Sequence, residues 1–555
     1  MADISSFDRA TMLQRLQNEH FDVLVIGGGI TGVGVALDAA ARGLSTALVE
    51  ADDFAAGTSS RSSKLVHGGL RYLQNGDVRL VYQALRERKR LRHNAPHLVK
   101  ILPFLIPILS QDGLLPRRVA RALGVAMWAY DLTGGWRIGK FHKRLKADEA
   151  FEHLPTMERS RLAGGYLYYD ATVDDARLVL TVARTAAGHG AVVANRCRVS
   201  GFGHDADGQA ISAQVDTGSG IIDVRATTIV SATGVWADEL SAMEDGVTHN
   251  TIRPAKGVHL TVAWDKVRND VAAVIPVPGD KRSLFVVPWG PNADGTFQHT
   301  YIGTTDTDYE GRLDDPPCDS TDIDYVLVAL NSAVTTCITL YDVTGVWAGL
   351  RPLVRSAGSA RTADLSRRHR VTTGPGGVIG IAGGKLTTYR EMAEDTVDEV
   401  IERLGGQGLQ RRRSPTRSLE LLGADGYQEA PAGTLAAHLG NRYGSLETDI
   451  TALVAHDPSL AEPLVPGLAY LRAEAVYAAR HEMATSLVDV VTRRTRAHLF
   501  DRNATVAAAP EIAALLAVEL GWDSDEQRRQ LAAYADLVTQ ERHDSGEVPA
   551  STTGE

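Results

Sequence analysis

The stretch FDVLVIGGGITGVGVALDAAARGLSTALVE, residues 21–50, decides the fold class of this 555-residue chain. Its pattern predicts a strand, a glycine turn, a helix at residues 33–42 and a second strand at residues 46–49. Glu50 closes the unit, 23 residues after Gly27. An apolar strand, a G-x-G-x-x-G loop, a helix and a terminal acid in this order are the context of a dinucleotide-binding fold. The stretch therefore predicts an α/β protein that begins with a Rossmann-like domain.

Each part of the glycine loop has a chemical reason. Gly27 permits the tight turn, Gly29 lets the backbone approach a pyrophosphate, and Gly32 allows close packing of helix and strand. We expect the free N–H groups of the helix N-terminus to face the phosphates, and Glu50 to accept hydrogen bonds from an adenosine ribose, which favours FAD or NAD. The predicted cofactor-binding residues of this unit are Gly27, Gly29, Ile30, Thr31, Gly32, Glu50 and Ala51.

Two later segments repeat the pattern of an apolar strand that ends at a glycine. They are TTIVSATGVWADEL, from Thr227, and GGVIGIAGGKLTTYR, from Gly376. Glycine permits a close approach of the backbone, so several strands of one sheet are expected to converge on one ligand. Ala232 and Gly234 join the predicted cofactor site for this reason. The cofactor domain is therefore predicted to be assembled from distant pieces of the chain.

The remaining sequence divides into segments that differ in composition and in hydrophobic period. Strand patterns dominate at residues 241–365, whereas alanine-rich segments of helical period after residue 419 predict a separate helical domain. The predicted divisions are a cofactor domain in three parts (1–75, 161–240 and 366–404), a helical, substrate-side insertion (76–160), a strand-rich substrate domain (241–365), a linker (405–418), the helical domain (419–540) and a disordered tail (541–555).

Charge, cysteine content and apolar runs exclude some classes of protein. The formal net charge of -10 argues against a nucleic-acid-binding protein, which needs a basic surface. Cys197, Cys318 and Cys337 show no metal-ligand spacing, so we expect reduced, buried thiols in a cytosolic protein, and no metal site. The N-terminus lacks the apolar core of a signal peptide, and the longest apolar run, residues 101–109, has about half the length of a membrane span. The chain is not expected to cross a membrane.

Further motifs follow the glycine loop along the chain: TSSRSSKLVHGGLRYL, DDARLVL, IRPAKGVHL, IGTTDTDYEG, GLRPL, GGKLTTYR and, near the C-terminus, LVDVVTRRTR. Together they resemble the FAD-dependent glycerol-3-phosphate dehydrogenases, within the wider glycine oxidase and D-amino-acid oxidase-like flavoproteins. The resemblance implies an FAD domain, a mixed-sheet substrate domain with antiparallel strands, and an all-α C-terminal domain. It also implies a homodimer that oxidises sn-glycerol 3-phosphate to dihydroxyacetone phosphate and passes electrons from FAD to a membrane quinone.

The resemblance also implies which residues meet FAD. Thr58, Ser59, Ser63 and Lys64 would wrap its phosphates and ribityl chain, and Val199 would meet the adenine through its backbone. The glycine pairs of two motifs, VHGGL and GGKLT, are expected to admit the flavin ring close to the backbone. The remaining implied cofactor residues are Leu65, His67, Gly384, Lys385, Leu386 and Thr387. The histidine among them could meet the flavin or only hold its loop.

Glycerol 3-phosphate needs cations for its phosphate and a proton acceptor near its secondary alcohol. A planar guanidinium can bind phosphate oxygens through two hydrogen bonds, so Arg71 and Arg351 are expected to hold the phosphate. Lys385 would reach the substrate or the flavin. His259 is the predicted proton acceptor, because the unperturbed pKa of imidazole lies near neutrality, although it could instead be a satisfied core residue. The predicted catalytic residues are His259, Arg351 and Lys385.

For three other predicted substrate-binding residues, the alternative is a purely structural role. Lys256 could bind substrate or be a solvated lysine, whereas Thr305 and Asp306 could hold the alcohol or form an Asx-type turn. The predicted substrate site is completed by two phenolic donors, Tyr72 and Tyr389, and by Arg367.

Residues 116–146 form a local basic segment, with eight Lys or Arg against one acid, Asp131. If the segment is helical at residues 117–130, Met127 and Tyr130 share an apolar face opposite the basic positions. Such a helix is compatible with attraction to anionic lipid, at the inner face of the cytoplasmic membrane. The alternative is an amphipathic helix packed on its own domain.

Three other functions stay open beside the quinone-linked dehydrogenase. They are an oxygen-dependent glycerophosphate oxidase of the same fold, an amino-acid or amine oxidase, and a flavin-binding protein without turnover. Arg71, Arg351 and Lys385 gather more positive charge than one carboxylate needs, which disfavours the amino-acid oxidase. The sequence separates the dehydrogenase from the glycerophosphate oxidase poorly.

Overall fold

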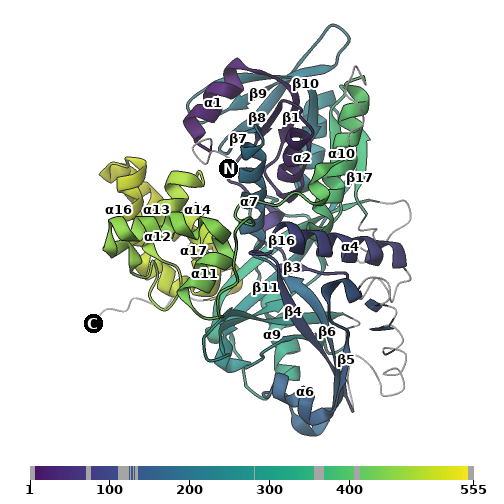
Figure 1. Cartoon of the computed structure of the whole chain (residues 1–555), viewed down its shortest axis with the longest axis vertical. Coiled ribbons are helices and arrows are strands. Elements are labelled where there is room, and N and C mark those ends of the chain that lie inside the picture. The colour runs from purple at the N-terminus through teal and green to yellow at the C-terminus, as the bar shows by residue number, and fades with distance from the viewer. Residues whose placement is uncertain are drawn as a thin grey trace.

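The computed structural model describes residues 7–69, 77–110, 135–280, 282–355, 368–405 and 413–547, together with positions 124, 127, 128, 130 and 131. One end of the molecule is built on an eight-stranded sheet (Figure 1). Five of its strands pair in parallel in the order β18-β10-β1-β2-β7, and antiparallel strands flank them. The strands are β1 (His20–Ile26), β2 (Thr46–Val49), β7 (Val192–Ala194), β8 (Arg198–His204), β9 (Ala210–Asp216), β10 (Ile221–Ser231), β17 (Arg370–Thr373) and β18 (Ile379–Ala382). The predicted Rossmann-like domain, assembled from distant segments, is confirmed.

Helices cover this sheet, which explains why its central strands are apolar almost throughout. The helices are α1 (Arg9–Asn18), α2 (Ile30–Ala41), α7 (Asp175–Gly188), α8 (Ala237–Asp245) and α10 (Tyr389–Arg403). Helix α2 begins directly after the glycine loop and packs against α7 and α10 (Figure 1). A Cβ at Gly34 would lie 2.8 Å from the ring of Tyr389, so this glycine permits the close packing of α2 on α10.

A second, ten-stranded sheet forms the other end of the molecule (Figure 1). Its long path runs β15-β11-β14-β13-β12-β4-β6-β3, with β16 beside β11 and β5 beside β6. The strands are β3 (Leu65–Val66), β4 (Lys100–Leu109), β5 (Lys143–Leu145), β6 (Leu162–Thr172), β11 (Ile252–Ala263), β12 (Ala272–Pro276), β13 (Ser283–Pro291), β14 (Phe297–Gly303), β15 (Thr307–Asp308) and β16 (Val343–Val354). All pairs are antiparallel except β12 with β4, so the sheet is mixed, and α6 (Ala147–His153) and α9 (Ser320–Ala333) pack on it.

Two predictions about secondary structure are wrong. Residues 76–160 are not a helical insertion, because after α4 (Val78–Asn94) the apolar run forms strand β4 in the middle of the second sheet. Proline disfavours a helix interior, and Pro103 and Pro107 lie within this strand. The tail is ordered further than predicted, since α17 (Ser524–Ser545) continues until Gly546, whose φ of 76° ends the helix in the left-handed region.

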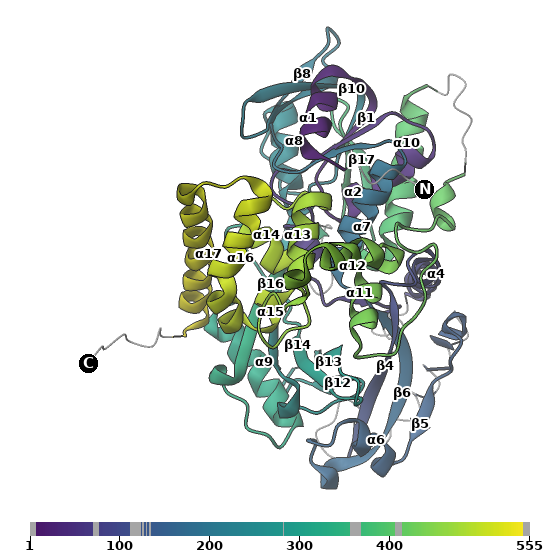
Figure 2. The same cartoon turned by 60° about the vertical axis from the view of Figure 1, so that its left-hand side comes forward.

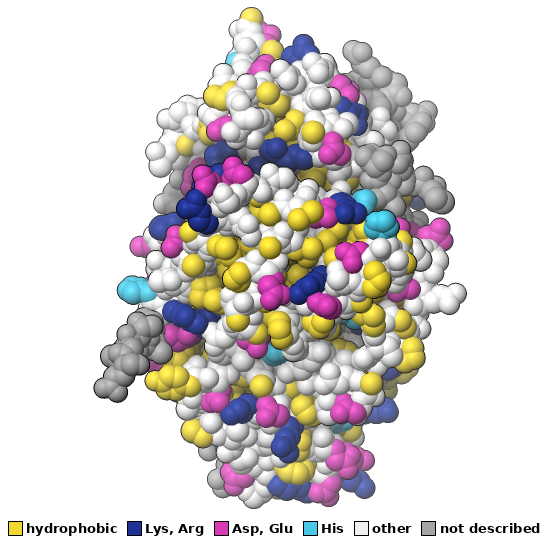
Figure 3. All heavy atoms as spheres, turned by 90° about the vertical axis from the view of Figure 1, so that its left-hand side faces the viewer, with side chains coloured by type: hydrophobic (Ala, Val, Ile, Leu, Met, Phe, Trp, Pro, Cys, Tyr) yellow, Lys and Arg dark blue, Asp and Glu magenta, His cyan; other side chains and the backbone are white. Residues whose placement is uncertain are grey.

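The C-terminal region is helical, as predicted, and lies beside the place where the two sheets meet (Figure 2). Its helices are α11 (Leu435–Tyr443), α12 (Glu447–His456), α13 (Arg472–His481), α14 (Leu487–Asp489), α15 (Ala497–Phe500), α16 (Arg502–Leu520) and α17. By length and composition, α16 is the one helix among the described residues that could cross a membrane, but Ile512, Ala513 and Leu516 on it are buried in the core of this region. Hydrophobic side chains also gather across the middle of this side of the molecule, among charges of both signs (Figure 3).

The predicted linker is partly fixed to the cofactor domain. The hydroxyl groups of Ser414 and Thr416 both donate hydrogen bonds to the carboxylate of Asp38 on α2. Residues 406–412 lie outside the described residues. The three cysteines are free, and the expectation that all are buried is wrong for Cys337, which is exposed.

Candidate functional site

One cavity of about 1250 Å³ lies where the two sheets and the helical region meet. It brings together most of the residues that the sequence predicted. The predicted residues that line it are Gly27, Gly29, Ile30, Thr31, Glu50, Ala51, Thr58, Ser59, Ser63, Leu65, His67, Val199, Ala232, Gly234, His259, Thr305, Asp306, Arg351, Gly384, Lys385, Leu386 and Thr387. Arg71, Tyr72 and Arg367 lie outside the described residues.

The glycine loop is shaped as the sequence argument requires. Gly27 has a φ of 112°, and a Cβ on it would lie 2.7 Å from the carbonyl oxygen of Ala232, directly after the neighbouring strand β10. A Cβ at Gly32 would lie 1.8 Å from the carbonyl oxygen of Gly27, so Gly32 serves the packing of α2 and does not line the cavity. The N-terminus of α2 opens to the cavity at Gly29 and Ile30, which fits the phosphates of a dinucleotide.

Glu50 stands at the end of β2, beside this loop. Its Oε2 accepts a hydrogen bond from the Gly28 N–H at 2.6 Å, and its Oε1 accepts one from the Asp52 N–H at 2.8 Å. Burial raises the pKa of Glu50 to about 7, and the nearby charge of Asp53 also raises it. A carboxylate fixed in this way suits the hydroxyl groups of a ribose, so this end of the cavity fits an adenosine.

His259, on β11, lies on the opposite sheet. Its Nε2 is 2.9 Å from the Ser63 Oγ, and its ring stacks on Trp347 with ring centres 4.8 Å apart. Burial lowers the pKa of His259 well below its usual value, and the charges of Lys64 and Arg351 lower it further. The imidazole is therefore neutral near neutral pH, as a proton acceptor must be.

Arg351, on β16, lines the cavity close to this histidine. Its Nη1 donates to the Asp306 carboxylate at 3.2 Å, and its Nη2 donates to the Thr304 Oγ1 at 3.1 Å. Arg282, which no sequence motif indicates, also lines the cavity and donates to the Asp306 carbonyl at 2.8 Å. Two guanidinium groups on one wall make this part of the cavity suited to an anion.

The two glycine-pair motifs lie together, although about 320 residues separate them. The His67 N–H donates to the Thr387 Oγ1 at 3.2 Å, so the loops before Gly69 and after Gly384 are joined directly. Gly383 and Gly384 have φ values of 78° and 81°, which turn the chain sharply from β18 and bring Lys385 to the cavity wall. The histidine thus holds its loop and also lines the cavity.

Besides Gly32, three described residues of the predicted site do not line the cavity. Lys64 is fully buried and paired with Asp175 at 3.1 Å, so it anchors the loop from behind. Lys256 points away, to Asp319 and Asp322, both at 2.6 Å. The third, Tyr389, packs against α2 at Gly34. The partners of both lysines come from helices far along the chain, which no local pattern indicates.

The basic segment is only partly described, and its apolar face is not free for lipid. Met127 and Tyr130 are buried, and the Tyr130 hydroxyl donates to the Asp170 carboxylate at 2.9 Å. For these two residues the alternative that the sequence left open, packing on their own domain, is confirmed. Trp128 and Phe141, by contrast, are each 55% exposed and their ring centres lie 6.4 Å apart.

The fold and the cavity define the class of protein. The parallel sheet, the glycine loop and the ribose-side acid are those of a dinucleotide-dependent oxidoreductase, and the protein-family model described as "FAD dependent oxidoreductase" matches residues 22–390. A second family model, "C-terminal domain of alpha-glycerophosphate oxidase", matches residues 414–527. The cofactor of this class is FAD, and the residues present fit it.

Within this class, the chain belongs to the glycerol-3-phosphate dehydrogenase family. It is 42% identical to "Glycerol-3-phosphate dehydrogenase 2" of Mycobacterium tuberculosis, over 97% of this chain and 92% of that protein. It is 37% identical to "Probable glycerol-3-phosphate dehydrogenase, mitochondrial" of Caenorhabditis elegans, over 95% of this chain and 74% of that protein. A structure of the glycerol-3-phosphate dehydrogenase from Bacillus halodurans complexed with FAD is similar with a TM-score of 0.76 and 28% identity, over 99% of both chains.

Proposed function

We propose that this protein oxidises sn-glycerol 3-phosphate to dihydroxyacetone phosphate and passes the electrons to a membrane quinone. The observation that carries the proposal is the pairing, on one cavity wall, of a neutral histidine with two arginines, His259 with Arg351 and Arg282. A polyol phosphate needs both, a proton acceptor for its alcohol and cations for its phosphate. The names of the relatives support the same substrate.

Each residue has a separate task in this reaction. Arg351 binds the phosphate, and Lys385, which enters the cavity from the other sheet, adds a second cation. His259 accepts the proton of the secondary hydroxyl, while Ser63 and the Trp347 ring keep the imidazole in place. Bound FAD supplies the acceptor for the hydride that leaves the same carbon.

The proposed quinone acceptor requires a surface that meets the membrane. Trp128 and Phe141 are exposed side by side, and Lys140 and Lys143 lie on either side of Phe141 in the sequence. Aromatic and basic side chains together are typical of a protein surface at the membrane interface. We therefore propose peripheral association with the inner face of the cytoplasmic membrane. A homodimer is proposed from the family resemblance alone, and its mass in detergent would test it.

The substrate is tested by adding glycerol 3-phosphate to the yellow holoenzyme without oxygen. We expect the flavin absorbance near 450 nm to bleach, because the cofactor is reduced when the substrate is oxidised. An equal concentration of glycerol, which lacks the phosphate, is the control. Bleaching by an amino acid and not by glycerol 3-phosphate would contradict the proposal.

The electron acceptor needs a second experiment, because the family model of the C-terminal region is named for an oxidase. We expect rapid reduction of a soluble quinone analogue by the substrate-reduced enzyme, and slow release of hydrogen peroxide in air. Stoichiometric hydrogen peroxide, at a rate equal to substrate turnover, would identify the protein as a glycerophosphate oxidase instead.

A further inference from the structure

The cavity is not completed by the FAD-dependent oxidoreductase region alone. The helical region forms one of its walls, with residues from α14, α17 and the π-helical turn Val490–Arg494. The residues that form this wall include Thr485, Ser486, Val488, Arg493, Gln530 and Leu537. A side chain of this wall can therefore reach a ligand that the other domains bind.

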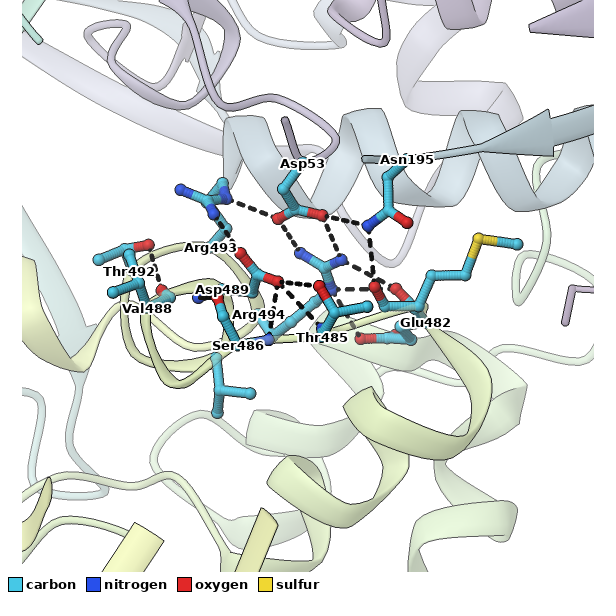
Figure 4. A network of polar contacts seen from close by, with 12 residues as sticks. Asp53, Asn195, Glu482, Thr485, Ser486, Val488, Asp489, Thr492, Arg493 and Arg494 are labelled. Atoms are coloured by element: carbon cyan, nitrogen blue, oxygen red, sulfur yellow. Dashed lines mark hydrogen bonds and ion pairs between the residues drawn. The ribbon is translucent and has the colours of Figure 1, made fainter. Parts of the chain in front are cut away.

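Arg493 is the charged residue of this wall, and its direction is fixed. Its Nε donates to the Asp53 Oδ2 at 2.6 Å, and its Nη2 donates to the Asp489 Oδ1 at 2.6 Å (Figure 4). Among the described residues, no hydrogen bond is made by its Nη1. The π-helical turn, closed by a bond of 2.8 Å from the Thr495 N–H to the Val490 carbonyl, places the residue there. Such turns are frequent at functional sites.

The Asp53 carboxylate, which holds Arg493, is itself held by several hydrogen bonds. Both oxygens of Asp53 accept from Arg494, at 2.7 and 2.8 Å, and Asn195 donates to it at 3.0 Å (Figure 4). Asp53 follows β2 by four positions and Asn195 follows β7 directly. The helical region is thus fastened to the loops at the carboxyl ends of these two parallel strands, where a Rossmann-like domain binds its ligand.

Arg493 lies at the adenosine end of the cavity. Its positive charge acts on the Glu50 carboxyl, where it opposes the effect of burial on the pKa. Val199, which the family resemblance places beside the adenine, lines the same cavity. A planar guanidinium can donate to ribose hydroxyls and can also lie against an adenine ring.

We infer that Arg493 is a cofactor-binding residue of the helical region, which contacts the adenosine half of FAD. The helical region then binds more tightly to the rest of the chain when FAD is present, because a ligand shared by two regions stabilises their contact. The inference requires FAD as cofactor, but it does not depend on the proposed substrate or electron acceptor.

The test measures binding to the apoprotein, without turnover. For Arg493→Met, we expect the affinities for FAD and for ADP to fall by the same factor, at least about tenfold, because ADP contains only the adenosine and pyrophosphate. Arg480→Met is the matched control, since Arg480 lies in the same region but pairs with Glu519 away from the cavity. Flavin fluorescence and calorimetry give the two affinities.

Two results would overturn the inference. One is a parent-like affinity of Arg493→Met for FAD, and the other is a loss of FAD affinity with ADP binding unchanged. If Arg493→Met does not fold, Arg493→Lys retains a cation beside Asp53 but loses the planar fork. We expect it to bind ADP several-fold more weakly, with the apoprotein melting as the parent does, and parent-like ADP binding by this variant would contradict the inference.

Discussion

At the scale of single residues, glycines in neighbouring strands make the room that the proposed catalytic side chains occupy. A Cβ at Gly303 would lie 2.2 Å from the His259 ring, and one at Gly257 would lie 2.5 Å from the Arg351 Nη2. The strands that carry these glycines pair directly with the strands that carry the functional residues. The positions of the two side chains are therefore sensitive to changes at these glycines, of which Gly257 lines the cavity and Gly303 does not.

The first prediction concerns Arg351. Arg351→Ala should raise the KM for glycerol 3-phosphate about tenfold to a hundredfold, because a hydrogen bond to a charged group contributes about 1.5–3 kcal/mol. The flavin content should stay that of the parent. Arg253→Ala is the control, since Arg253, near the start of β11, pairs with Asp308 and does not line the cavity.

Gly257→Ala adds a finer test of the same site. The added methyl group would push the guanidinium without removing it, so the KM should rise by a smaller factor than in Arg351→Ala. Steady-state kinetics with purified holoenzymes measure both effects. Equal KM values for the parent and Arg351→Ala would contradict the proposed role of this residue.

The second prediction concerns His97, which is buried and whose ring nitrogens have no hydrogen bond among the described residues. Burial, together with the charges of Lys100 and Arg177, lowers its pKa to about 3. Because the folded pKa is below the unfolded value near 6.5, its stabilising contribution is complete above pH 6.5. As the pH falls from 6.5 towards 3, this contribution to the free energy of unfolding should decrease by about 1.4 kcal/mol for each pH unit.

His97→Phe removes this titrating group and retains a ring of similar size. We expect the variant to lose less stability than the parent when urea unfolding is compared at pH 7 and pH 5, on holoenzymes with equal flavin content. An identical loss in the parent and the variant would show that His97 does not contribute to acid sensitivity.

At the scale of elements, α7 connects the cofactor domain to the helical region. Arg177 and Arg184 on this helix reach the carboxylate of Glu482, which follows α13 and is fully buried. Asp174, the N-cap of the helix, accepts from Arg496 at 3.0 Å. A buried carboxylate between two arginines is strongly disfavoured once one charge is removed.

The third prediction tests this connection. Glu482→Gln should lower the free energy of unfolding by about 3–5 kcal/mol, because it leaves two buried guanidinium groups without their carboxylate. Glu519→Gln is the control, since Glu519 pairs with the half-exposed Arg480 and should lose only about 0–1 kcal/mol. Thermal or urea unfolding of both holoenzymes gives the comparison, and equal losses would contradict the argument.

Elements with strong local signals could be predicted from the sequence. The βαβ unit was predicted because its glycine spacing, its small-residue helix and Glu50 all lie within one short stretch. Strand β4 was missed, because an apolar run with prolines has no period that separates strand from helix. The burial of Lys64 and Lys256 was missed as well, since Asp175 and Asp319 become their partners only in the folded chain.

The same holds for the site: residues in local motifs could be predicted, whereas residues that meet only through long-range contacts could not. The glycine pairs that line the cavity and Arg351 lie in sequence motifs, so the sequence predicts that they come together. Arg282 belongs to no such motif, and it was missed. Arg493 lies within the motif LVDVVTRRTR, but only the folded chain brings it to Asp53 and thus to the cofactor cavity.

At the scale of the whole molecule, the distribution of charge matters more than the net charge. The chain carries a net charge of -10, which by itself would keep it away from an anionic bilayer. Near Trp128 and Phe141 the local charge is positive instead, since Lys140, Lys143 and Arg144 lie within three residues of Phe141 in the sequence. Screening limits the repulsion from distant acids to about 10 Å at 0.1 M salt, so a local basic surface can still bind.

The last prediction follows from this local surface. Trp128→Ser combined with Phe141→Ser should weaken binding to vesicles rich in anionic phosphatidylglycerol, and each change of Lys140 or Lys143 to Gln should cost about 1 kcal/mol, or about fivefold. Tyr341→Ser is the control, because Tyr341 is 98% exposed but far along the chain from this segment. Turnover with a soluble quinone analogue should be the same in all variants, so that only delivery of electrons to a vesicle-bound quinone falls. Parent-like sedimentation of the aromatic double variant with anionic vesicles, or an equal loss in Tyr341→Ser, would place the membrane contact elsewhere.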